Sequence, residues 1–208
     1  MDRQELIRKV ALKMDEISSS DDVIVSVGID DNNPLYTQID SLLNESVNDM
    51  LMKAPIYRLY NHINIVASSR PTTVNAIKVG IIEVPADFLR FASIEDKAFQ
   101  RSIVTLAVEG DDVDKRQHNK HLVAKKAKPV AVISNDATKK RIITCYSYGL
   151  ADTPSPTMQY VKRYDGNTTL DDYQIDIATW ICAGKVFAAQ GDTVKGKTCD
   201  ENAIALMA

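Results

Sequence analysis

Apolar side chains in the first quarter of the chain recur every three or four residues, which is the spacing of one face of an α-helix. This pattern covers residues 3–17 and again residues 34–53. Asn33 is a suitable N-cap for the second run, and Pro34 fits the first helical position. Between the runs, Val23–Val27 is a short apolar stretch that fits either a strand or an extended arm. We therefore predict two amphipathic helices at the N-terminal end.

The pattern changes to a period of two from residue 76 onward, which is the spacing of strands with one buried face. It predicts strands on either side of Val84–Asp87, a hairpin over Pro129–Tyr148 and a further strand over Met158–Tyr164. Residues 56–74 have no clear period, and we expect a short helical piece followed by a loop. The middle of the chain is thus predicted to form a small antiparallel sheet.

The helical period returns near the C-terminal end of the chain. Apolar residues share one face of a helix over residues 170–189, and Thr169 and Asp172 have the spacing of a capping box at its start. A last helix is predicted over Asp200–Met207. The helices therefore flank the strands along the chain instead of alternating with them.

This segregation of helices and strands predicts an α+β fold, with N-terminal and C-terminal helices packed with a small antiparallel β-sheet. The length of 208 residues fits one large domain or two small ones. We expect a single domain over 1–208, with a mainly helical part at 1–75, an antiparallel sheet at 76–165 that carries a basic loop at 109–128, and C-terminal helices at 166–208.

The composition is that of a globular protein, with 45% hydrophobic and 25% charged residues. The net charge of −3 does not mark the whole chain as a nucleic-acid binder. No run approaches the roughly 18 apolar residues of a membrane span, and the first residues lack a signal-peptide pattern. Cys145, Cys182 and Cys199 show no pairing pattern, which favours reduced thiols of cytosolic origin.

One segment, GDTVKGKT at Gly191–Thr198, satisfies the G-x-x-x-x-G-K-[ST] pattern of a phosphate-binding P-loop. A working P-loop follows a buried strand and precedes a helix. Here the preceding residues continue a helical period, and few residues follow Thr198. We interpret Gly191 as the glycine that ends a helix. A nucleotide-binding enzyme is therefore kept only as an unfavoured alternative.

Two other patterns suggest metal binding and are interpreted structurally. His118 and His121 are three residues apart, but basic residues surround them and no third ligand is suggested nearby. Asp30–Asn33 resembles half a calcium loop without its central glycine and closing glutamate. No catalytic residue, metal or cofactor is therefore predicted.

A basic segment, KRQHNKHLVAKKAK at Lys115–Lys128, contains no acidic residue. It has no aromatic residue either, so stacking on nucleic-acid bases is not expected. We expect an exposed loop that is either simply solvated or contacts DNA or an acidic partner. Its six cations are Lys115, Arg116, Lys120, Lys125, Lys126 and Lys128.

The stretch VPADFLR at Val84–Arg90 predicts a structural corner between two strands. Pro85 cannot donate a ladder hydrogen bond and therefore ends a strand. Asp87 can accept from local backbone N–H groups and hold the turn. The side chains that follow need apolar surroundings. The residues assigned to the corner are Pro85, Asp87, Phe88, Leu89 and Arg90.

Three stretches resemble the head-to-tail adaptor and ring proteins of short-tailed bacteriophages, including the crAss-like group that infects gut Bacteroides. VPADFLRFASIEDKAFQRSI at Val84–Ile103 is similar to their Leu-Pro-x-Asp-Phe-Leu-Arg stretch. The N-terminal block from Asp22 through NNPLYTQIDSLLNESVNDMLMKAPIYRL is similar to their long first helix and its Ala-Pro ending. The closing pattern of a long helix with TWICAGKVF, a short break and a small-residue helix is also similar. The chain departs from the family at Phe99, where a Trp is expected, and the basic segment at 115–128 has no counterpart.

The resemblance implies a non-enzymatic virion protein of the phage neck, made in the cytoplasm of the host bacterium. It would form a ring, twelvefold in the family, between the portal and the tail, and DNA would pass through its lumen without sequence recognition. The expected partners are further copies of the chain, the portal and tail proteins. A nucleic-acid-binding accessory protein that uses Lys115–Lys128 is the other alternative.

The end of the chain is the expected docking element. The segment after Gly191 is short, and a helix of that length is marginal in water by itself. We therefore expect it to be ordered by docking, with Ile204, Leu206 and Met207 as the partner-binding residues.

Overall fold

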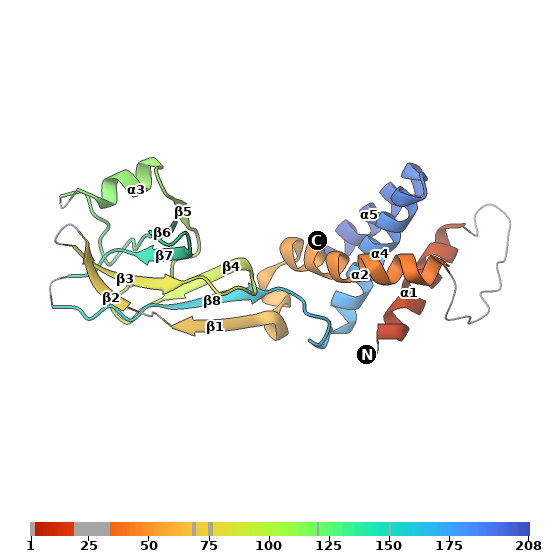
Figure 1. Ribbon diagram of the computed structural model, residues 1–208, viewed down its shortest axis with the longest axis horizontal. Coiled ribbons are helices and arrows are strands. Elements are labelled where there is room, and N and C mark those ends of the chain that lie inside the picture. The colour runs from red at the N-terminus through yellow and green to blue at the C-terminus, as the bar shows by residue number, and fades with distance from the viewer. Residues whose placement is uncertain (1–2, 19–33, 68–69, 75–76, 120, 150) are drawn as a thin grey trace. The chain divides into compact units, whose positions relative to one another are not determined.

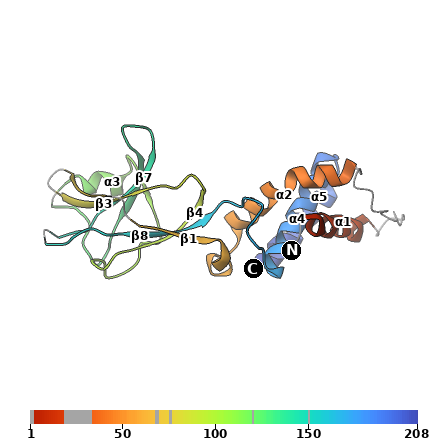
Figure 2. The same ribbon diagram turned by 60° about the horizontal axis from the view of Figure 1, so that its bottom comes forward.

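The computed structural model describes residues 3–18, 34–67, 70–74, 77–119, 121–149 and 151–208. The predicted strand or arm at Val23–Val27, the cap at Asn33 and the half calcium loop at Asp30–Asn33 lie outside these residues. The fold is α+β, as predicted (Figures 1 and 2). It divides into two compact units: a helical unit of residues 1–62 and 163–208, and a sheet unit of residues 63–162.

The helical unit confirms three helix predictions and extends the fourth. The helices at 3–17, 34–53 and 170–189 are present within two residues of their predicted bounds, and the last helix begins at Thr193 rather than Asp200. Two short 3-10 turns follow the second helix, as the expected helical piece. The elements are α1 (Arg3–Ser18), α2 (Pro34–Lys53), η1 (Ile56–Arg58), η2 (Tyr60–His62), α4 (Asp172–Ala189) and α5 (Thr193–Met207).

The central element of the helical unit is α4, which packs against α1, α2 and α5 (Figure 1). Its buried side chains are not confined to the one face that the sequence predicted, although Asp172 and Asp176 are exposed, so the helix needs neighbours on several sides. Side chains on every side of it are buried, among them Ile175, Ile177, Trp180, Cys182 and Phe187. Each neighbouring helix contributes buried apolar side chains to this core. Examples are Val10 of α1 and Leu43 of α2, which are both fully buried.

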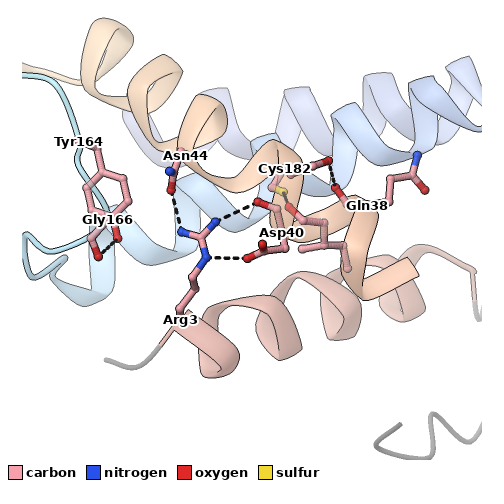
Figure 3. Close-up of polar contacts among 9 residues, drawn as sticks. Arg3, Gln38, Asp40, Asn44, Tyr164, Gly166 and Cys182 are labelled. Atoms are coloured by element: carbon pink, nitrogen blue, oxygen red, sulfur yellow. Dashed lines mark hydrogen bonds and ion pairs between the residues drawn. The ribbon is translucent and has the colours of Figure 1, made fainter. Parts of the chain in front are cut away.

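Polar contacts tie α1 to α2 at the edge of this core (Figure 3). The guanidinium of Arg3 forms an ion pair with Asp40 and donates to Asn44 Oδ1 over 2.8 Å. It also donates to the backbone oxygen of Asp40, so three acceptors on α2 hold one side chain of α1. This cluster fixes the start of α1 on the second helix.

The start of α4 differs from the predicted capping box at Thr169 and Asp172. The N-cap is Asp171, whose carboxylate accepts from the backbone N–H of Gln174 over 2.8 Å, and Gln174 Oε1 accepts from the N–H of Asp171. Gln174 is buried and also donates to the backbone oxygen of Arg58 and to Asn61. The capping box therefore lies two residues later than predicted. Its glutamine, Gln174, also bonds η1 and η2 to the start of α4.

The crossing of α4 and α5 depends on two glycines. A Cβ added to Gly196 would lie 3.2 Å from the backbone oxygen of Gly184, and one added to Gly184 would lie 3.2 Å from the backbone oxygen of Gly196. Contacts this short mean that even a methyl group on either glycine would require the facing backbone to move by a few tenths of an ångström. On α5, Gly196, Cys199 and Ala203 form the narrow buried seam that meets α4. Small residues thus bring the two helix backbones close together.

The sheet unit contains two sheets, and its strand order is β1-β8-β4 in one and β2-β3-β7-β6-β5 in the other. All pairings are antiparallel except that of β5 with β6. Figures 1 and 2 show the three strands β1, β8 and β4 side by side. The bounds are β1 (Ile63–Ala67), β2 (Arg70–Val74), β3 (Ile77–Glu83), β4 (Phe88–Glu95), β5 (Ala107–Val108), α3 (Asp112–Gln117), β6 (Ala131–Asn135), β7 (Arg141–Cys145) and β8 (Thr157–Lys162).

The strands on either side of Val84–Asp87, the hairpin over Pro129–Tyr148 and the strand after it are confirmed. Two expectations were wrong. The region at 56–74 contains β1 and β2 where a loop was predicted, so strands begin before residue 76. The basic loop at 109–128 contains the short helix α3. The main core of the unit is built from Ile82, Ile94, Ile103, Ile143, Met158 and Tyr160.

The glycine crossing generates a stability prediction. Gly196→Leu should lower the free energy of unfolding by about 2 kcal/mol, because overpacking costs roughly 1–3 kcal/mol and outweighs the gain in helix propensity over glycine. Thr198→Leu is the matched control, since Thr198 is exposed on the same helix. It should stay within about 0.5 kcal/mol of the unsubstituted protein. Urea unfolding measures both, and equal losses for the two variants would contradict the close crossing.

Candidate functional sites

The P-loop-like segment begins in the turn between α4 and α5, as predicted, but from Thr193 onward it belongs to α5, and the element before it is the helix α4 and not a strand. Gly191 has φ +88° and ends α4. Its N–H donates to the backbone oxygen of Ala188, and the N–H of Asp192 donates to that of Phe187. These two bonds are the Schellman pattern of a helix C-terminus. The first glycine of the segment therefore has a local structural cause.

The rest of the segment lies in the first turns of α5. The carboxylate of Asp192 accepts from the N–H of Lys195 over 3.1 Å, and the backbone oxygen of Asp192 accepts from the N–H of Gly196. The Thr198 hydroxyl donates to the backbone oxygen of Val194. In a P-loop these backbone donors and this hydroxyl would serve phosphate and Mg²⁺. Here the protein itself uses them, and the carboxylate of Asp192 already accepts from one of these N–H groups.

The corner at Val84–Arg90 joins β3 to β4, and the backbone N–H of Phe88 closes it by donating to the oxygen of Pro85. Asp87 Oδ1 accepts from the Tyr160 hydroxyl on β8 over 2.9 Å. The ring of Phe88 stacks on the ring of Tyr160, with centroids 5.8 Å apart. The bond of Asp87 is thus to a side chain 73 residues away, where local backbone groups were expected. Leu89 and Arg90 are half-buried.

Tyr160 is the residue that the corner needs and that sequence reasoning missed. Burial raises the pKa of its hydroxyl most; a bond with Asn64 opposes this shift, and the Asp87 carboxylate adds to it. The hydroxyl therefore stays protonated and able to donate at neutral pH. No local sequence pattern predicts the pair of Tyr160 and Asp87, because the two residues are far apart in the sequence.

A second carboxylate, Asp96, organises the segment after β4. It accepts from the Tyr148 hydroxyl over 2.9 Å and from the backbone N–H groups of Ala98 and Ser155, each over 2.8 Å. Phe99, where the resembling family has Trp, packs on the Tyr148 ring with centroids 5.1 Å apart. The DKAFQ stretch is therefore held by the Asp96–Tyr148 pair as a second structural joint of the sheet unit.

The basic segment is more ordered than a simple loop. The carboxylate of Asp111 caps α3 by accepting from the N–H of Asp114 over 2.7 Å, and this bond lowers the pKa of Asp111. Asp114 is buried, accepts from the N–H of Gly110 and lies 3.3 Å from His118 Nε2. Gln117 is buried and accepts from the N–H of Ala124. These bonds fold the segment back onto its own helix.

The six cations of this segment do not form one free surface. Lys126 Nζ lies 2.7 Å from Asp152 Oδ2, and this pair lowers the pKa of Asp152. Lys115 lies 3.5 Å from Asp112 on the surface, and Lys120 lies outside the described residues. Arg116, Lys125 and Lys128 are exposed. Whether they contact DNA or an acidic partner stays a prediction.

Two of the three residues that were expected to bind a partner are exposed on α5. Ile204 and Leu206 are 61% and 43% exposed, and Met207 is half-buried. The helix that carries them is 15 residues long and is packed along α4. The expected short segment that awaits a partner is therefore replaced by a held helix with an apolar exposed end.

Metal ligands and reactive thiols are not assembled in the part of the chain that the structure describes. No group of three or more His, Cys, Asp or Glu side chains there could hold a metal ion. Cys145, Cys182 and Cys199 are buried. Burial raises the pKa of Cys145, and it raises the pKa of Cys182 and of Cys199 to about 11. Among the described helices, none is long and apolar enough to cross a membrane.

No family model matches the chain, and no curated protein matches it. The resemblance to phage adaptor proteins therefore rests on the three sequence stretches alone.

The geometry of Gly191–Thr198 predicts that the segment binds no nucleotide. Isothermal titration with Mg²⁺–ATP and Mg²⁺–GTP should show no heat of binding for the unsubstituted chain, because Asp192 and the helix backbone occupy the donors. Micromolar binding that Lys197→Ala abolishes would contradict this prediction.

The corner predicts a specific loss for one hydroxyl group. Tyr160→Phe should lower the free energy of unfolding by about 1–2 kcal/mol, because the Asp87 carboxylate loses its donor while the stacked ring is kept. Tyr57→Phe is the control, since Tyr57 is 74% exposed, and it should be neutral. Thermal or urea unfolding measures the difference, and a neutral Tyr160→Phe would show that the Asp87 bond does not hold the corner.

Proposed function

We propose that the chain is a structural subunit of a bacteriophage neck, in which copies of it form a ring between portal and tail. The observation that carries the proposal is the structure of Val84–Arg90, the stretch with the most specific resemblance to the adaptor proteins. Asp87 and Phe88, its polar and aromatic positions, are both engaged by Tyr160 inside the sheet unit. The stretch is a joint of the fold, as a structural subunit requires.

The helix hairpin of α4 and α5 supports a role without nucleotide chemistry. Its glycines have structural causes: Gly191 ends a helix and Gly196 permits a close helix crossing. The hydroxyl and backbone donors of the P-loop pattern are bonded within α5. The feature of the sequence that most suggested an enzyme is thus part of the scaffold.

The exposed end of α5 is the surface that we assign to a neighbouring subunit, whether the portal or another ring protein. Ile204 and Leu206 present apolar area to solvent, while the opposite seam of the helix is anchored on α4. The surface is therefore already ordered before a partner binds, so binding does not have to offset the entropy cost of ordering the segment. Contacts between unlike surfaces of successive copies form a ring when the rotation between copies closes, and the resemblance implies twelve copies with DNA in the lumen.

Point substitutions test this surface better than removal of residues 192–208. Deletion of α5 would uncover the buried side chains of α4 and unfold the unit. Ile204→Glu combined with Leu206→Glu leaves the anchoring seam intact and should keep the fold. We expect this variant to be absent from purified phage particles, whereas Thr198→Glu, an exposed change on the same helix, should be incorporated at the normal level.

The readout is the amount of the chain in purified particles, measured by quantitative mass spectrometry, with circular dichroism as the check on folding. Normal incorporation of a folded Ile204→Glu/Leu206→Glu variant would show that the end of α5 is not the docking surface. Absence of the unsubstituted chain from the particles would contradict the proposed function itself.

A further inference from the structure

Charge is distributed very unevenly between the two units. The helical unit has 10 Lys and Arg against 18 Asp and Glu, a net charge of −8. The sheet unit has 15 Lys and Arg against 10 Asp and Glu, a net charge of +5. The modest −3 of the whole chain therefore conceals an acidic unit and a basic unit. Asymmetry of this kind indicates a polyanionic partner for the basic part.

Within the sheet unit, three consecutive cations lie at the tip of the hairpin formed by β6 and β7. Lys139, Lys140 and Arg141 are all exposed. None of them forms an ion pair with a carboxylate among the described residues. They differ in this respect from Lys126, which forms an ion pair with Asp152. We call Lys139–Arg141 the hairpin tip.

The acidic residue of this turn, Asp136, forms hydrogen bonds within the turn and, in the part of the chain that the structure describes, no ion pair with the three cations. Asp136 Oδ1 accepts from the N–H and the hydroxyl of Thr138, over 2.8 and 2.7 Å, and from the N–H of Lys140 over 2.9 Å. These bonds, that of the Thr138 hydroxyl foremost, lower the pKa of Asp136. The backbone N–H and oxygen of Asp136 also bond to the turn. The turn is therefore held by several hydrogen bonds of Asp136, while its three cations are exposed.

The backbone of the tip favours glycine, yet a lysine stands there. Lys139 has φ +63°, in the left-handed region where a Cβ is unfavourable and glycine carries no steric penalty. Hairpin turns commonly place glycine or asparagine at such a position. A residue that is locally unfavourable in a rigid, exposed turn is the kind of outlier from which a functional role is inferred.

The chemistry of the tip fits phosphate groups better than a protein surface. From Asn135 to Arg141 the sequence NDATKKR has no large apolar side chain. Protein interfaces have apolar cores in which Lys is depleted. Contacts to a nucleic-acid backbone need only cations and hydrogen-bond donors. With no aromatic residue in the turn, stacking on bases is excluded as a source of affinity.

We infer that the hairpin tip binds the phosphate backbone of double-stranded DNA without sequence preference. The acidic helical unit repels the same polymer, so the contact is confined to the sheet unit. One copy binds weakly, because three phosphate contacts supply little affinity at physiological salt. Several copies around one duplex would add their contacts, since linked sites raise the effective concentration. The inference concerns the free chain and does not require the proposed ring.

The test measures DNA affinity as a function of salt. Fluorescence anisotropy of a labelled duplex, titrated with the full chain at low salt and then at rising salt, gives the slope of log K against log salt concentration. Each phosphate contact contributes about −0.9 to this slope. Lys139→Gly should make the slope shallower by about 0.9 without lowering the melting temperature, because glycine suits φ +63°. Adding Lys140→Ala and Arg141→Ala should make it shallower by about 2.7 in all.

Lys197→Ala is the matched control, because it removes one exposed cation from the helical unit and should leave the slope unchanged. Duplexes of different sequence should bind alike. No binding by the unsubstituted chain at low salt, or an unchanged slope in the triple variant, would overturn the inference. Loss of self-association in the triple variant, with DNA affinity unchanged, would overturn it in favour of a contact between copies. None of these failures would bear on the chain's presence in phage particles.

Discussion

The burial of α4 on all of its sides is the constraint on which the helical unit depends. Twelve of the 18 residues of this helix are buried, and each large apolar side chain among them gains roughly 1.5–3 kcal/mol on burial. Three helices are needed to cover it, and they come from both ends of the chain. Gly184 and Gly196 let α5 approach α4 closely enough to cover its remaining side. The same requirement explains the P-loop-like sequence, because its glycines end one helix and admit the next.

The sheet unit depends on a different kind of contact, in which tyrosine hydroxyls donate to carboxylates. Tyr160 bonds Asp87 at the corner between β3 and β4, and Tyr148 bonds Asp96 after β4. In both pairs an aromatic ring also packs on the tyrosine: Phe88 in the first and Phe99 in the second. The stretch that resembles phage adaptors contains both carboxylates and both phenylalanines. Its residue types are therefore explained by two joints of one architecture.

The sequence was informative where the pattern is local and periodic. Helices α1, α2 and α4 and the strands around the corner follow from apolar spacing, and Gly191 follows from its place after a helical run. Strand β2 was missed because RPTTV at Arg70–Val74 alternates poorly and contains a proline. Helix α3 was missed because DVDKRQ is nearly all polar and is held by an Asp111 cap and by contacts of Gln117. The partner of Asp87 and the close approach of Gly184 to Gly196 are tertiary facts that no local pattern carries. The total charge does not reveal the difference between the units, because the acidic helical unit and the basic sheet unit largely cancel.

The central claim is that the chain is a building block of the phage neck. Immunogold labelling of a tagged copy on intact particles, viewed by electron microscopy, tests it most directly. The account predicts gold at the junction of head and tail, with the tag placed at the N-terminus so that α5 stays free. Gold that is absent from intact particles, or found only on the capsid shell or the tail fibres, would contradict the claim.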